Sequence, residues 1–128
     1  MSYLIDSDWL IDAAVGRPKA VALLSEFTSA GPAISAISVA EVCEGAYGSR
    51  DPGFMLTRFE RFLSEFAILP VTAPVAERFA WLRSKLRRQG LLIPDMDLLI
   101  AATALVHDLT LVIRNHRHFK RIPGRRMQ

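Results

Sequence analysis

Short apolar runs alternate along the chain with longer stretches in which apolar residues recur every three or four positions. Residues 3–5, 33–34, 68–71 and 109–113 have the length and aliphatic content of buried strands. No hairpin dipeptide such as Asn-Gly joins these runs. The alternation therefore predicts βα units, with a parallel sheet that helices cover on both faces.

Six helices are predicted between and after the strands. Their starts are marked by residues that cap helices or suit a first turn, and glycines or prolines follow several of their ends. Ser38 and Glu41 have the spacing of a capping box, in which the glutamate reaches back to the cap amide. The expected segments are 7–14 (capped by Ser7 or Asp8), a helix from Pro18 with Val21, Leu24 and Phe27 inward, 38–47, 54–66, a helix capped by Thr72 that ends before Gly90, and 95–107.

Composition places the chain among compact globular proteins. Of 128 residues, 51% are hydrophobic and 23% are charged, which excludes a disordered or fibrous class, and the length fits one domain over residues 1–128. No apolar run approaches the roughly 20 residues of a membrane span. The start, MSYLIDSD, has acidic residues and no basic leader, and Cys43 has no second cysteine to pair with. These features predict a cytoplasmic protein.

Charge is distributed unevenly along the chain. Residues 1–113 carry a net charge of −3, whereas residues 114–128, the C-terminal basic segment, carry six Lys and Arg and no acid. An acidic body with a basic end favours a polyanionic partner that reaches a negative site. The alternative is a solvated surface tail.

Four oxygen-bearing side chains fall where the chain leaves a strand or enters a helix. Asp6 follows the first strand, Glu41 and Asp97 lie in early helical turns, and Asn115 follows the last strand. Each has an ordinary explanation as a turn or cap residue, and Asp95 and Asp97 both suit a helix N-terminus. Ligands of open parallel sheets bind at the carboxyl edge of the strands, however, so the joint placement favours one shared site.

Several carboxylates at one place repel one another unless a cation lies between them. Mg²⁺ or Mn²⁺ fits oxygen ligands and retains waters that substrate phosphates replace. A zinc site is a weak alternative, because only His116 and His118, on a shared strand face, would supply nitrogen ligands. The glycines form neither GxGxxG nor GxxxxGK[ST], which excludes the dinucleotide and P-loop classes.

Three stretches resemble the successive signatures of PIN-domain nucleases, specifically toxins of the VapC type: LIDSDWLID, ISVAEVCEGAYG and IPDMDLLIAATALVHDLTLVIRNHRHFKRIPG. The resemblance spans nearly the whole chain in order and spacing. It implies a single PIN-like α/β domain with a parallel sheet of four to five strands flanked by helices. It also implies Mg²⁺-dependent endoribonuclease activity, a cognate VapB-type antitoxin whose tail enters the active groove, and a homodimer.

The resemblance carries over residue by residue. Asp6, Glu41 and Asp97 match the first three acids of the family, and Asn115 stands where the family has a fourth acid or an Asn. Asp95 has no fixed counterpart and is interpreted as a cap or outer-shell group. Three positions depart from the pattern: Asp8 replaces a usual Asn, Ile113 replaces a frequent Thr or Ser, and Asn115 offers an amide oxygen without charge.

The leading hypothesis is phosphodiester hydrolysis of RNA by metal-activated water. Asp6 and Asp97 would hold the ion, Glu41 would be a further ligand or orient the water, and Asn115 would assist. Two alternatives stay open: an Asp-nucleophile phosphatase of the haloacid-dehalogenase type, and a catalytically degenerate module that binds RNA or a partner. The side chains expected to steer the RNA backbone are Arg87, Arg88, Arg114, Arg117, Lys120 and Arg121.

Overall fold

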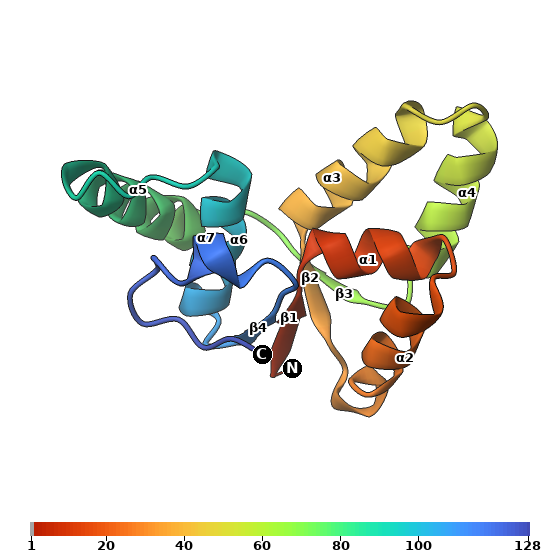
Figure 1. Cartoon of the computed structure of the whole chain (residues 1–128), viewed down its shortest axis with the longest axis horizontal. Coiled ribbons are helices and arrows are strands. Elements are labelled where there is room, and N and C mark those ends of the chain that lie inside the picture. Colours follow the sequence, from red (N-terminus) through yellow and green to blue (C-terminus); the bar gives the residue numbers. More distant parts are fainter. Residues whose placement is uncertain (1) are drawn as a thin grey trace.

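A four-stranded parallel sheet forms the centre of the molecule (Figure 1). The structure is a computed structural model that describes residues 2–128. The strands are β1 (Tyr3–Ile5), β2 (Ala33–Ser35), β3 (Ala67–Leu69) and β4 (Thr110–Val112), in the order β3-β2-β1-β4. The chain builds outward from β1 to β3 and then returns to add β4 on the other side of β1. The strand order therefore reverses between β1 and β4, which is where ligands of such sheets bind.

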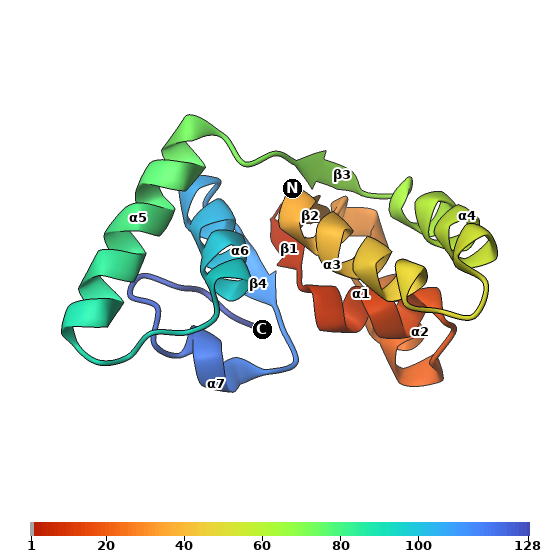
Figure 2. The ribbon, with the colours of Figure 1, turned by 90° about the horizontal axis from the view of Figure 1, so that it is seen from above.

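Helices cover both faces of the sheet, as Figures 1 and 2 show from two directions. One layer holds the helices from the first half of the chain, and the other holds those from the second half. None of the helices within residues 2–128 combines the length and hydrophobicity of a membrane span. The first layer comprises α1 (Ser7–Ala14), α2 (Pro18–Ser25), α3 (Ala36–Tyr47) and α4 (Pro52–Leu63), and the second α5 (Ala73–Arg88), α6 (Asp95–Val106) and α7 (His116–Phe119).

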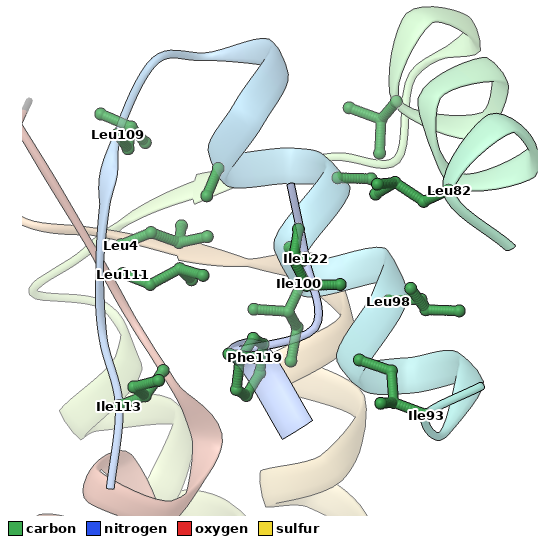
Figure 3. Close-up of a cluster of buried hydrophobic side chains, with 14 of the residues drawn as sticks. Leu4, Leu82, Ile93, Leu98, Ile100, Leu109, Leu111, Ile113, Phe119 and Ile122 are labelled. Atoms are coloured by element: carbon green, nitrogen blue, oxygen red, sulfur yellow. The ribbon is translucent and has the colours of Figure 1, made fainter. Parts of the chain in front are cut away.

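Alternate residues of β1, β2 and β4 enter two separate hydrophobic cores. Leu4 and Leu111 pack with α5 and α6, in the cluster drawn in Figure 3. Ile5 and Val112, one position further along, pack with α1 to α4. Because side chains of a strand point to opposite faces in turn, strands of only three residues serve both cores. The predicted parallel sheet with two covered faces is confirmed.

The starts of three helices differ from the prediction. Helix α4 begins at Pro52 with Asp51 as its cap, and it ends at Leu63, whereas the prediction was 54–66. The backbone of Asp6 is the N-cap of α1, and its carboxylate makes no cap hydrogen bond. Helix α3 begins two residues before Ser38, because the Ser35 hydroxyl accepts a hydrogen bond from the Ile37 amide at 3.0 Å. Ser38 and Glu41 therefore do not form the capping box that their spacing allows. Thr72, by contrast, caps α5 as predicted.

Some segments are shorter or more exposed than their apolar pattern indicates. Helix α2 ends at Ser25, and Val21, expected to face inward, is 47% exposed. Strand β3 covers residues 67–69, and both Ile68 and Val71 are exposed. An edge strand and a peripheral helix bury only one face, so an apolar residue on the other face meets solvent.

The C-terminal basic segment is folded against the body of the protein. Phe119 and Ile122 are fully buried in the core of Figure 3. The Gln128 amide donates to the Leu111 carbonyl at 2.7 Å, and Met127 forms a parallel bridge with Leu111. The sheet has four strands, within the four to five that the resemblance implies, and the C-terminal basic segment adds only one bridge beside β4. The segment is not a free tail, although most of its Lys and Arg side chains are exposed to solvent.

Candidate active site

A pocket of about 210 Å³ opens at the carboxyl edge of the sheet, next to β1 and β4. The structure brings all four sequence-predicted site residues to its wall. They come from four separate parts of the chain, which meet where the strand order reverses. The lining consists of Asp6, Ser7, Asp8, Glu41, Asp97, Asn115, His118 and Phe119.

Asp6 lies at the bottom of this acidic site, only 5% exposed. Its backbone amide donates to the Val112 carbonyl at 3.0 Å, which continues the pairing of β1 with β4 and fixes where the side chain leaves the sheet. Burial raises the pKa of Asp6 from its ordinary value of 3.8 to about 7. A hydrogen bond from the Ser7 backbone amide lowers the pKa of Asp6. The charges of Asp8, Asp97 and Glu41 raise it further.

Glu41 faces Asp6 from the second turn of α3 and is held by a hydroxyl. Ser7 Oγ donates to Glu41 Oε1 at 2.6 Å and lies 3.1 Å from Ser38 Oγ. Burial raises the pKa of Glu41, the Ser7 hydrogen bond lowers it, and the charges of Asp97 and Asp8 raise it further. The sequence interpretation missed this role of Ser7 and Ser38. Their positions, directly after Asp6 and three residues before Glu41, were the available signal.

Asp97 projects from the first turn of α6, and its Oδ2 lies 2.8 Å from Nδ1 of His118. His118 is a site residue that was considered only as a zinc ligand on a strand. The structure places it on α7 instead, with His116 exposed on the same short helix. Asp95, two residues before Asp97, is exposed, pairs with Arg83 at 2.9 Å and does not line the pocket.

The three positions that depart from the family pattern lie in different environments. Asp8 lines the pocket and is half-buried, so it adds negative charge there. Asn115 also lines the pocket, but its Oδ1 accepts a hydrogen bond from the Arg117 amide at 3.1 Å and caps α7. Ile113 is 3% exposed, belongs to the hydrophobic core in Figure 3, and is not part of the lining.

The donor set of the pocket suits a hard divalent cation. Carboxylate oxygens of Asp6 and Asp97 are the predicted ligands, and the burial that raises the pKa of Asp6 makes its charged form costly unless a positive charge lies nearby. Within residues 2–128, no group of three or more His, Cys, Asp or Glu side chains is placed to hold a metal ion on its own. Mg²⁺ is ordinarily held by one or two carboxylates, with waters and substrate phosphates completing its shell. The residues present fit such an ion.

None of the predicted RNA-steering residues lines the pocket. Arg114 forms an ion pair with Asp12 and lies over the Trp9 ring, 5.4 Å from its centroid. Arg121 donates to the carbonyls of Leu91 and Leu92, with the Leu92 contact at 3.1 Å. The others, all exposed, are Arg87, Arg88, Arg117 and Lys120.

Comparison with known proteins gives a consistent family assignment. The PIN domain pattern matches residues 3–125. "Ribonuclease VapC2" of Haemophilus influenzae is 36% identical over 124 residues, which cover 95% of this chain and 92% of the relative. "tRNA(fMet)-specific endonuclease VapC" of Shigella flexneri is 27% identical over 128 residues, covering 100% and 97%.

A solved structure shows the same architecture over the full length. The chain superimposes on VapBC2 of Rickettsia felis, solved bound to a DNA fragment from its promoter, with a TM-score of 0.91. The sequences are 29% identical, and the match covers 100% of this chain and 98% of that chain. The resemblance therefore extends to the order and packing of the elements that form the pocket.

Proposed function

The chain belongs to the PIN domain family, and within it to the VapC-type ribonucleases, and from that premise we propose a Mg²⁺-dependent endoribonuclease that is the toxin of a type II toxin–antitoxin system. The observation that carries this proposal is the meeting of Asp6, Glu41 and Asp97 in one pocket. These acids come from three separate elements, and helix capping alone gives no reason for them to converge.

Asp6 and Asp97 are the residues that would hold Mg²⁺, with Mn²⁺ as a substitute. When bound, the ion supplies a polarised water and offsets the negative charge that develops on the phosphate. Burial favours the protonated form of Asp6, so the ion and this carboxylate stabilise one another at neutral pH. Without such an ion, the carboxylates of Asp6, Glu41 and Asp97 would repel a phosphodiester.

Glu41 is the residue that orients the attacking water. Ser7 Oγ holds its Oε1 at 2.6 Å, which leaves Oε2 to accept a proton from that water. The raised pKa of Glu41 makes its carboxylate a better proton acceptor at neutral pH. Asn115 assists from the rim, and Arg117 and Lys120 position the RNA backbone without reading its bases.

The proposed partners follow from the relatives. A VapB-type antitoxin binds the toxin, since the solved neighbours are VapBC complexes. We place the protein in the cytoplasm as a homodimer whose single domain covers residues 1–128. Because two relatives are named for tRNA(fMet), this tRNA is the first RNA to test.

The test compares two acids in the first turn of α6. Asp97→Asn is expected to abolish EDTA-sensitive RNA cleavage while the protein stays folded, because one of its proposed ion ligands is lost. Asp95→Asn is the matched control and keeps cleavage, since Asp95 is exposed and outside the pocket. Both proteins must be freed of copurifying antitoxin. Undiminished cleavage by Asp97→Asn contradicts the assignment.

A second function, RNA or partner binding without cleavage, is favoured by one observation. Asn115 Oδ1 caps α7, so this oxygen is already engaged and the fourth acidic position contributes no charge. RNA that is bound but uncut in the presence of Mg²⁺ would establish this function. The phosphatase alternative has less support, because the lining of the pocket within residues 2–128 includes no lysine to assist an aspartyl-phosphate.

A further inference from the structure

His118 and Asp97 form an ion pair or hydrogen bond inside the pocket, between residues 21 positions apart. His118 Nδ1 lies 2.8 Å from Asp97 Oδ2. Both side chains are largely covered, with 32% of His118 and 22% of Asp97 exposed. Since an ionised carboxylate only accepts hydrogen bonds, Nδ1 of the imidazole carries the proton in this contact.

The single turn of α7 is built to hold His118 in that place. At its start, Asn115 Oδ1 accepts a hydrogen bond from the Arg117 amide. At its end, the Phe119 side chain is 1% exposed and packs into the core (Figure 3). The helix also packs on α6, which carries Asp97. The imidazole is therefore fixed from both ends of its own element.

We propose that His118 is a positioning residue for Asp97. The Nδ1–H group donates to Oδ2, fixes the rotation of the carboxylate about its last torsion, and leaves Oδ1 for a divalent cation. That torsion is soft in free aspartate, so an unheld carboxylate would spread over many orientations. Hydrogen bonds to ligating side chains orient the ligands, and losing one typically reduces metal affinity or activity about 10- to 100-fold.

This positioning role of His118 does not depend on the charge of the imidazole. Nδ1 donates a hydrogen bond both in the neutral tautomer that carries its proton on Nδ1 and in the imidazolium. Asn115 belongs to the same arrangement, since its side chain caps the helix that presents His118. The inference rests on the proposed function only through the cation site. RNA cleavage itself is not part of it.

The experiment measures binding of Mn²⁺ alone, without RNA, by calorimetry. His118→Ala is expected to weaken Mn²⁺ binding about 10- to 100-fold with little change in melting temperature. His118→Asn, whose amide nitrogen can replace Nδ1, should retain most of the affinity, whereas His118→Gln, whose amide nitrogen lies further from the backbone, should not. His116→Ala, exposed on the same helix, is the matched control and should bind as the wild type.

Cleavage assays supply a second readout. If His118 only positions Asp97, excess Mn²⁺ restores most of the rate of His118→Ala, since the defect lies in binding the ion. Wild-type Mn²⁺ affinity in His118→Ala would overturn the inference. Rescue by glutamine and not by asparagine would also overturn it, because His118 would then act through Nε2.

The two proposals fail in distinguishable ways. If Asp97→Asn binds Mn²⁺ as tightly as the wild type, the cation site of the proposed function is wrong. If Asp97→Asn loses binding and His118→Ala does not, only the positioning role is wrong. Should His118→Ala fail to fold, the comparison of His118→Asn with His118→Gln decides the question.

Discussion

The Asp6 carboxylate shows at the scale of one residue how a site for a cation differs from a structural turn. A turn aspartate is solvated or caps a helix, whereas Asp6 is 5% exposed and makes no cap hydrogen bond. Its pKa is raised to about 7, chiefly by burial and further by the neighbouring acids. A charged Asp6 therefore costs folding free energy in the absence of a cation.

The first prediction concerns how Asp6 links stability to pH. From pH 4 to pH 7, about the range spanned by its ordinary and raised pKa values, the unfolded chain has released the Asp6 proton while the folded protein retains it. The contribution of Asp6 to the free energy of unfolding therefore falls as pH rises through this range. Without metal, Asp6→Asn should be more stable than the wild type at pH 8, by at most about 4 kcal/mol at about 1.4 kcal/mol per pKa unit.

Urea unfolding in EDTA at pH 4.5, 6 and 8 measures this effect. The difference between Asp6→Asn and the wild type should shrink toward pH 4.5, where the unfolded carboxyl is also partly protonated. Asp95→Asn, which removes an exposed carboxylate, should give no comparable gain. Equal stability of Asp6→Asn and the wild type at pH 8 would contradict a free-energy cost of burying the charged Asp6 carboxylate.

At the scale of elements, sequence periodicity predicted the order of strands and of the longer helices. Local spacing failed to predict hydrogen-bond partners that tertiary contacts determine. Thr72 caps its helix as predicted, because that cap depends only on neighbouring residues. Ser38 and Glu41 have the spacing of a capping box, yet Glu41 accepts its hydrogen bond from Ser7, which lies 34 positions earlier. No local pattern encodes that partner.

The residues of the candidate site also fall into two groups, those that the sequence pattern predicted and those that it missed. Asp6, Glu41 and Asp97 were predicted because each follows a strand or lies in an early turn of a helix in a parallel α/β pattern. His118 was missed because its histidine-rich surroundings, NHRHF, gave no indication of a helix. Only the packing of α7 on α6 brings His118 to Asp97.

The second prediction tests the corrected start of α3. Ser35→Ala removes the hydroxyl that accepts from the Ile37 amide and should lower the free energy of unfolding by about 1 kcal/mol, the usual value of such a cap. The measurement is urea unfolding, with Thr72→Ala as the comparison, because Thr72 caps α5 in the same way. An unchanged midpoint for Ser35→Ala, with a lowered one for Thr72→Ala, would contradict the assigned cap.

At the scale of the whole molecule, the strand order and the charge distribution serve the same site. The acids gather beside β1 and β4, and the C-terminal basic segment begins at the end of β4 and packs back against the sheet. Two of its exposed cations, Arg117 and Lys120, lie directly beside the pocket residues His118 and Phe119 in the chain. These cations can attract a nucleic-acid backbone even though the acids of the pocket repel it.

The last prediction uses salt dependence to separate a direct contact between Arg117 and a phosphate from long-range attraction by the net charge. Arg117 is exposed at the start of α7, beside the pocket residue His118, whereas Arg114 is neutralised by Asp12. In an Asp97→Asn background, which prevents cleavage, Arg117→Ala should weaken RNA binding. The slope of log affinity against log salt concentration should become shallower by about one, since one fewer phosphate is neutralised. Fluorescence anisotropy from 50 to 300 mM salt measures it.

Arg50→Ala provides the matched control, because it removes the same charge from the loop between α3 and α4, which Figure 1 shows on the other side of the sheet from α7. A loss of long-range attraction alone would affect both variants equally, since both lower the net charge by one. A direct phosphate contact affects Arg117→Ala alone. If the two slopes are the same, RNA does not pass over α7, and the backbone must approach the pocket from another side.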